Sequence, residues 1–183
     1  MTKSGQRLGL YRILDRLGQG GSSEVFSAKG PWGKLVALKI QRRPRKRQRF
    51  MQEFRILNQN LHPLLIDVYE FGMLDSGWSY LVMEMIEGKS ATAYARTFYG
   101  KDRLWKSVIL AARVAEAFGA LHDINWIHGD LKSKNILVSS DGFPHLIDFE
   151  LARPLESTGT GKFFGTRSYA PPEQHDGQNL TTS

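Results

Sequence analysis

The feature of this sequence that most constrains its fold is a change of pattern near residue 87. Before this point, short apolar segments alternate with turns, and helical spacing is confined to residues 50–61. After it, the alanine-rich segment from Leu104 to His122 carries apolar residues at helical intervals. We therefore predict an α+β fold with two lobes. The first is β-rich with one helix, and the second is mainly helical.

The first part of the chain is a succession of predicted strands separated by turns that contain glycine, together with serine, proline or aspartate. We expect extended segments at residues 11–17, 24–29, 35–40, 64–71 and 80–86. The helix between them should end before His62-Pro63, because the residue before a proline disfavours helical geometry. Two further short apolar segments, at residues 135–139 and 144–147, flank a turn at Asp141-Gly142.

Composition narrows the class of protein. With 41% apolar and 23% charged residues, the 183-residue chain is typical of globular domains. The sequence has no cysteine, which excludes disulfide scaffolds, cysteine nucleophiles and thiolate metal sites. No apolar segment approaches the roughly 20 residues of a membrane-spanning helix, and no secretory signal begins the chain. These features favour a cytoplasmic protein.

The net charge of +7 is unevenly distributed. Six basic residues lie between Arg42 and Arg49. Such a segment can hold phosphate backbones or acidic surfaces, but a solvated loop that leads into a helix is the simpler interpretation. No aromatic residue lies among the six basic ones, so the stacking used by nucleic-acid-binding proteins is not indicated. Nucleic-acid binding is therefore not favoured.

Two chemistry-bearing segments lie in the first lobe. Residues 17–25 are rich in glycine and serine between two extended segments, so backbone N–H groups there can approach phosphate oxygens. A plain glycine-rich hairpin explains this segment equally well. Lys39 closes an apolar strand, where it is either an exposed strand end or a phosphate ligand. Glu53, on the predicted helix, is the natural carboxylate to hold that lysine.

Two more segments lie in the second lobe. In residues 128–135, Asp130 can accept a hydroxyl proton, Lys132 can stabilise phosphoryl charge, and Asn135 can bind a metal. Asp148 follows an apolar segment and suits Mg²⁺ that bridges phosphates. Each segment taken singly is also compatible with a surface turn. The occurrence of all four in this order makes chance a poor explanation.

Together these segments resemble the eukaryotic-type (Hanks-type) Ser/Thr protein kinases, from Tyr11 to the end of the chain. The resemblance implies a two-lobed protein-kinase-like fold, with an N-terminal extension at 1–10, an N-lobe at 11–87 and a partial C-lobe at 88–183. It implies ATP and Mg²⁺ as cofactors and a protein Ser or Thr as substrate. Lys132, two residues after Asp130, favours the Ser/Thr class. No oligomeric state is predicted.

The resemblance also assigns roles to residues. It implies catalytic roles for Asp130, Lys132, Lys39 and Glu53, and magnesium binding by Asn135 and Asp148. The nucleotide-binding residues that it implies are Leu17, Gly18, Gly20, Val25, Ala37, Lys39, Met83, Glu84 and Met85. Residues 165–173 resemble the end of the activation segment, which places Thr166 near Asp130 and Lys132.

The sequence departs from the family pattern at several positions. Ser23 replaces a loop glycine and Pro171 an alanine, which are small changes. Gly129 replaces the arginine that meets an activation-segment phosphate, so we expect activity to depend little on phosphorylation of Ser157, Thr158 or Thr160.

Glu150 replaces the glycine of Asp-Phe-Gly. A glutamate with positive φ costs roughly 1–2 kcal/mol, so one backbone state of this segment should be disfavoured.

The chain ends at Ser183, where the resemblance predicts the start of a further helix. We interpret it as a truncated or partial kinase, in which the apolar face of residues 108–121 loses much of its cover. Two other functions stay open. One is a pseudokinase, or inactive nucleotide-binding module, which Gly129 and Glu150 favour. The other is a small-molecule phosphotransferase, in which His-Gly-Asp is common, although such enzymes lack the activation segment that ends at Glu173.

Overall fold

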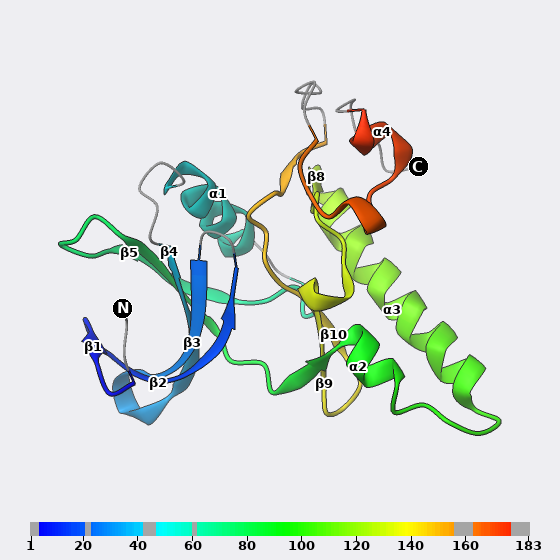
Figure 1. The fold of residues 1–183 in the computed structure, drawn as a ribbon, viewed down its shortest axis with the longest axis horizontal. Coiled ribbons are helices and arrows are strands. Elements are labelled where there is room, and N and C mark those ends of the chain that lie inside the picture. The colour runs from blue at the N-terminus through cyan, green and yellow to red at the C-terminus, as the bar shows by residue number, and fades with distance from the viewer. Residues whose placement is uncertain (1–3, 21–22, 42–46, 60–61, 156–162, 177–183) are drawn as a thin grey trace. The chain divides into compact units, whose positions relative to one another are not determined.

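The computed structural model describes residues 4–20, 23–41, 47–59, 62–155 and 163–176. The chain divides into two compact units (Figure 1). Unit 1 comprises Met1–Asn60 and Ile66–Ile86, and unit 2 comprises Leu61–Leu65 and Glu87–Ser183. Unit 1 is built on one large sheet, whereas unit 2 combines helices with short strands, so the α+β prediction is confirmed.

Unit 1 contains a six-stranded antiparallel sheet in the order β1-β2-β3-β4-β6-β5. Its strands are β1 (Arg7–Leu8), β2 (Tyr11–Gln19), β3 (Ser23–Lys29), β4 (Leu35–Gln41), β5 (Val68–Met73) and β6 (Ser79–Glu84). Strands β2, β3 and β4 are neighbours both in the chain and in the sheet, because short connections can join antiparallel strands. The short strand β1 lies in the segment that the sequence indicated only as an extension.

Alternation along β4 gives the sheet two different faces. Successive side chains of a strand point to opposite faces. Leu38 and its alternate neighbours on β4 join a buried apolar cluster on one face of the sheet. The members of that cluster are Leu8, Tyr11, Ile13, Phe26, Ala28, Val36, Leu38, Ile40 and Val82. Ala37 and Lys39 consequently belong to the other face.

Helix α1 (Arg47–Asn58) packs against β5 and β6 (Figure 1). Its buried residues are Phe50, Glu53, Ile56 and Leu57. Spacings of three and four residues bring these side chains to one side of the helix, which explains why the helical pattern was visible in the sequence. The helix begins within the basic segment and ends before His62-Pro63, as predicted.

The prediction of a strand at residues 64–71 is wrong for the first half of this segment. β5 begins only at Val68. Leu64 and Leu65 are buried in unit 2, where Leu65 forms an isolated parallel bridge with Leu146. The backbone N–H of Leu146 donates to the Leu64 carbonyl at 2.8 Å. One continuous apolar segment therefore serves two units, and its apolar pattern alone does not show where it changes direction.

Unit 2 is arranged around the long helix α3 (Arg103–Asp123), which contacts β8 (Trp126–Ile127) and β10 (Pro144–Leu146). β10 pairs with β9 (Ile136–Ser139), which also pairs with β7 (Gly88–Ser90). β8 pairs with β11 (Arg153–Pro154). Unit 2 also contains the short helices α2 (Ala91–Ala95) and α4 (Pro172–His175) (Figure 1). Its two described 3-10 helices are η3 (Ser133–Asn135) and η4 (Arg167–Tyr169).

The burial of α3 changes along its length. Ala117 and Leu121, near its C-terminal end, are fully buried. In its first half, Trp105 is 67% exposed and Val108 is 49% exposed. In the described part of the chain, no helix combines the length and the apolar character that crossing a membrane requires.

A carboxylate ties together three strands of unit 1. The hydroxyl of Tyr11 on β2 and that of Tyr80 on β6 each donate to Glu70 of β5 at 2.7 Å. A Cβ at Gly72 would lie 2.2 Å from the Tyr80 ring, so glycine leaves the space through which this ring reaches Glu70. Burial, followed by the Glu70 hydrogen bond and charge, raises the pKa of both tyrosines from 10.0 to about 12.

We expect Tyr11 and Tyr80 to ionise near pH 12, and we expect Glu70→Gln to lower both pKa values only part of the way toward 10, because it removes the Glu70 charge but not the burial. The folded state holds these protons more tightly than the unfolded chain. Their stabilising effect is therefore complete below pH 10 and is lost as the pH rises from about 10 to about 12. Ultraviolet phenolate titration measures this, with Tyr11→Phe and Tyr80→Phe identifying each group. Ionisation of both near pH 10, with native circular dichroism retained, would contradict it.

Candidate active site

Lys39 and Glu53 form a buried ion pair in unit 1. The Lys39 Nζ lies 2.7 Å from Glu53 Oε1 and 2.8 Å from Oε2. The lysine side chain is 4% exposed and the glutamate is fully buried. The Nζ also lies 5.4 Å from the ring centroid of Phe50, one helical turn before Glu53. The helix thus fixes the position of a cation at the centre of the sheet.

The register of the sheet aligns most of the residues that the sequence marked for nucleotide binding. Gly18 on β2 lies opposite Val25 on β3, and Val25 lies opposite Lys39 on β4. Ala37 lies opposite Met83 on β6. Directly opposed residues share a face of the sheet, as do residues two apart on one strand. These five positions therefore lie on the face that carries the ion pair.

The other four predicted residues lie on or directly after strands β2 and β6. Leu17 lies where the β2–β3 register shifts, and it is half exposed. Gly20 follows β2, and its N–H donates to the Ser23 carbonyl at 2.8 Å. Glu84 is the last residue of β6, with Met85 next along the chain. The Glu84 N–H donates to the Asp67 carbonyl at 2.9 Å, which fixes the backbone at the end of the strand.

In unit 2, Asp130 lies at the centre of a polar cluster. Lys132 Nζ contacts its Oδ2, and Thr166 Oγ1 donates to its Oδ1 at 2.8 Å. Asn135 Nδ2 donates to the Asp130 carbonyl at 2.9 Å and lies 3.3 Å from Oδ2. Lys132 Nζ also lies 3.4 Å from Thr166 Oγ1, so the expected proximity of Thr166 to Asp130 and Lys132 is confirmed. One carboxylate thus has three donors with fixed positions.

His128 contacts the backbone of this cluster as a neutral imidazole. Its Nδ1 accepts from the Asp130 N–H at 3.3 Å, and its Nε2 lies 3.1 Å from the Ile147 carbonyl. The first contact leaves the proton on Nε2, which donates to the carbonyl. Burial lowers the pKa of His128, in agreement with the neutral form. The ring also lies 4.8 Å from that of Phe149, between centroids.

Asn135 and Asp148 offer a pair of oxygen ligands. Ile147 N–H donates to the Asn135 carbonyl at 2.9 Å, and Asp148 follows directly. The amide nitrogen of Asn135 is turned to Asp130, which leaves its amide oxygen for other partners. Carboxylate and amide oxygens are the ligands that Mg²⁺ prefers, so the residues present fit this ion. The described residues contain no cluster of three or more His, Cys, Asp or Glu suited to a metal.

The backbone around Asp148 adopts a specific conformation. Asp148 has a φ of 65°, whereas Glu150 is not among the described non-glycine residues with positive φ. The conformation in this structure therefore does not carry the energetic cost that was expected for a positive φ at Glu150. The left-handed geometry falls on an aspartate, a residue that tolerates it better than most. It turns the Asp148 backbone between β10 and Phe149.

Gly129 occupies a position where a side chain does not fit. Its φ is 77°, and a Cβ there would lie 2.4 Å from the Leu151 carbonyl oxygen. The replacement of the family's arginine by glycine is thus matched by the backbone around it. Ser157, Thr158 and Thr160, the positions expected to need no phosphate, lie outside the described residues.

Comparison with known proteins agrees with this geometry. A family model described as "Protein kinase domain" matches residues 11–183. The chain belongs to the protein kinase family. Its α+β architecture is accordingly that of a protein kinase fold, with the β-rich lobe in unit 1. Members of this family use ATP and Mg²⁺ and act on protein substrates.

Several relatives of this kinase chain are bacterial. It is 31% identical to the serine/threonine-protein kinase PknD of Mycobacterium tuberculosis, over 97% of the chain and 28% of that protein. It is 29% identical to the serine/threonine-protein kinase PknH of Mycobacterium bovis, over 98% of the chain and 31% of that protein. PknE of Mycobacterium bovis is 30% identical, over 98% and 33%. The chain thus spans about a third of the length of these relatives, or less.

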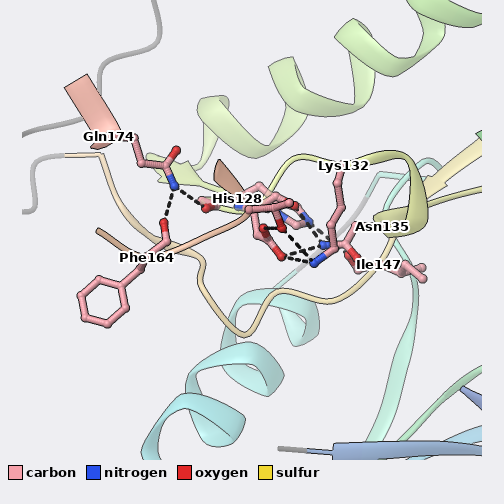
Figure 2. Close-up of polar contacts among 9 residues, drawn as sticks. His128, Lys132, Asn135, Ile147, Phe164 and Gln174 are labelled. Carbon is pink, nitrogen blue, oxygen red and sulfur yellow. Dashed lines mark hydrogen bonds and ion pairs between the residues drawn. The ribbon is translucent and has the colours of Figure 1, made fainter. Parts of the chain in front are cut away.

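Sequence reasoning assigned no role to Gln174, a polar side chain of this site. Gln174 on α4 donates from Nε2 to the carbonyls of Gly129 and Phe164 (Figure 2). Its position after Pro-Pro-Glu carries no chemical signal of its own, because the two acceptors are backbone groups that every residue has.

We expect Glu53→Leu to lower the free energy of unfolding of this kinase by about 3–5 kcal/mol, because it leaves a buried ammonium without its carboxylate partner. The double variant Lys39→Met/Glu53→Leu should be more stable than Glu53→Leu. Urea denaturation measures both. The control is Arg16→Met, which removes a pair at 3.6 Å with a 57% exposed arginine and should cost under about 1 kcal/mol. A double variant less stable than Glu53→Leu would contradict this expectation.

We expect Gly129→Ala to destabilise the protein by more than about 1–2 kcal/mol, since positive φ and the clash with the Leu151 carbonyl act together. Gly119→Ala is the matched control, because a Cβ on this α3 residue meets no atom within 4 Å and alanine favours a helix by about 0.5–1 kcal/mol. Thermal unfolding of the two variants should move in opposite directions. An unchanged midpoint in Gly129→Ala would show that the loop adopts another backbone conformation.

Proposed function

We propose that this chain is a Ser/Thr protein kinase domain that transfers the γ-phosphoryl group of ATP to a hydroxyl group of a protein. The observation that carries the proposal is the arrangement around Asp130. One of its oxygens accepts from Thr166 Oγ1 at 2.8 Å, and the other contacts the ammonium of Lys132. A carboxylate placed between a hydroxyl and an ammonium is suited to accept a hydroxyl proton beside a negatively charged phosphoryl group.

The side chains of unit 2 divide the chemistry between them. Asp130 orients the substrate hydroxyl and accepts its proton, while Lys132 stabilises charge on the transferred group. Thr166, whose Oγ1 reaches both side chains, places the activation segment beside Asp130. Asn135 fixes the Asp130 carboxylate through Nδ2 and leaves its amide oxygen for a cation. With Asp148 it would hold Mg²⁺, which neutralises phosphate charge when bound.

Lys39 holds the α- and β-phosphates of ATP in this proposal. The buried Glu53 carboxylate at 2.7 and 2.8 Å keeps the ammonium in one position, which lowers the entropy cost of placing it. Val25, Ala37 and Met83 share the sheet face with Lys39 and are suited to the apolar surface of a base. Leu17, Gly18, Gly20, Glu84 and Met85 complete the proposed nucleotide-binding set. Rate enhancement would come mainly from positioning and electrostatic stabilisation.

A second candidate is a pseudokinase, a module that binds nucleotide without transferring phosphate. Glu150 favours it, because it adds a carboxylate two residues after Asp148. A small-molecule phosphotransferase is less well supported. The hydrogen bond from Thr166 to Asp130 joins an activation-type segment to the catalytic loop, an arrangement suited to protein substrates.

We expect the unmodified protein to transfer labelled phosphate from ATP to Ser or Thr of a generic protein substrate in the presence of Mg²⁺. Asp130→Asn should lower the rate by roughly 10²-fold or more, because general-base catalysis alone contributes 10²–10⁴-fold. Lys39→Met and Asp148→Ala should each abolish transfer. Phosphoamino-acid analysis and ATP-dependent thermal shifts provide the measurements.

The matched controls are Asp102→Asn and Lys101→Met, which change exposed residues before α3 and should leave transfer intact. A nucleotide-induced thermal shift without transfer would favour the pseudokinase. Phosphate on a small alcohol and never on protein would favour the small-molecule phosphotransferase. Undiminished transfer in Lys39→Met or Asp148→Ala would refute the assignment of these residues.

A further inference from the structure

Gln174 makes two hydrogen bonds to backbone carbonyls, one 45 residues away and the other ten residues away in the sequence. It lies on α4 and is only 9% exposed. Its Nε2 donates to the Gly129 carbonyl at 2.9 Å and to the Phe164 carbonyl at 2.5 Å. An amide NH₂ group has two hydrogens, so a single nitrogen satisfies both acceptors. Figure 2 shows the side chain extended from α4 toward both carbonyls.

Each acceptor lies next to a residue of the Asp130 cluster. Gly129 directly precedes Asp130, and Phe164 lies two residues before Thr166. Thr166 in turn donates to Asp130 Oδ1 at 2.8 Å. Gln174 therefore holds the segment that carries the carboxylate together with the segment that carries its hydroxyl donor.

Two glycines provide the space for this amide. A Cβ at Gly165 would lie 2.6 Å from Gln174 Nε2 and 3.0 Å from the Gly129 carbonyl oxygen. Gly165 has a φ of 122° and Gly129 a φ of 77°, both in the region that favours glycine. The two glycine-containing segments thus approach closely, and the buried amide nitrogen contacts both.

We propose that Gln174 is a positioning residue for phosphoryl transfer, which sets the distance and orientation between Asp130 and Thr166 through the Gly129 and Phe164 carbonyls. This inference rests on the proposed function. A side chain without donors at this position removes the single group that both carbonyls share. The two segments would then be able to separate or rotate, because the hydrogen bonds that join them through Gln174 Nε2 are lost. A small displacement of a catalytic group is enough to reduce the rate strongly.

Gln174→Met and Gln174→Glu test the proposal, since both keep the approximate volume of the side chain. Methionine has no donor. An ionised glutamate only accepts and would face two carbonyl oxygens, whereas a protonated glutamate regains one O–H donor. Gln59→Met is the control, because Gln59 is an exposed residue directly after α1.

The first readout is phosphoryl transfer by the full chain. We expect Gln174→Met to lower kcat roughly 10- to 100-fold, with the KM for ATP changed less than about twofold. Gln174→Glu should be slower than Gln174→Met near pH 8. Relative to the unmodified protein at each pH, it should gain rate as the pH falls toward 6, whereas Gln174→Met should not. A merely structural role predicts no such recovery.

The second readout, amide hydrogen exchange, needs no activity. We expect faster exchange in residues 129–131 and 164–166 of Gln174→Met, and unchanged exchange in Gln59→Met. Unchanged exchange in these segments, or an unchanged kcat in Gln174→Met, would overturn the positioning role. If the unmodified protein transfers no phosphate but Gln174→Met still exchanges faster in these segments, the result would support the joining of the two segments by Gln174. It would refute only the proposed function.

Discussion

The hydrogen bonds of one carboxylate, that of Asp130, join the loop at residues 128–135 to the segment that carries Thr166. A carboxylate at a nearly buried position is stable only when donors satisfy its oxygens. Lys132 and Asn135 provide donors from the same loop, and Thr166 provides one from a segment 36 residues away. Gln174 donates to the carbonyls of Gly129 and Phe164, which lie beside Asp130 and Thr166 in the sequence. The hydrogen bonds of Gln174 on α4 and the close approach of Gly165 thus both lie beside the hydrogen bonds of the Asp130 carboxylate.

In unit 1 the same principle operates on a cation. Lys39 lies on the face of β4 opposite to the main apolar cluster, and Glu53 on α1 is its charge partner. Because a buried ion pair is sensitive to the loss of either member, the packing of α1 on this face and the charge state of Lys39 are linked. The Glu70 carboxylate plays a comparable part at another place in the sheet, where it joins β2, β5 and β6 through two tyrosines.

Local patterns predicted much of this architecture. The short apolar segment at residues 35–40 predicted β4, and the helical spacing from Phe50 predicted α1. The pattern failed at residues 64–71, where β5 starts only at Val68. A continuous apolar segment is compatible both with a strand and with a buried connection between two units, and hydrophobicity alone does not distinguish them. The short strands β1, β7, β8 and β11 carried no periodic signal, because a strand of two or three residues spans about one period.

The sequence by itself determined the groups that are close along the chain. Asp130, Lys132 and Asn135 lie within six residues, so any compact loop brings them together, and their types already indicated proton transfer and charge stabilisation. Only the tertiary structure decided the contacts across long separations, such as Gln174 with Gly129, which lie 45 residues apart. Those contacts use backbone carbonyls as acceptors, and a backbone carbonyl is identical in every residue. Their partners are selected by the path of the chain in space, which depends on the packing of the whole unit.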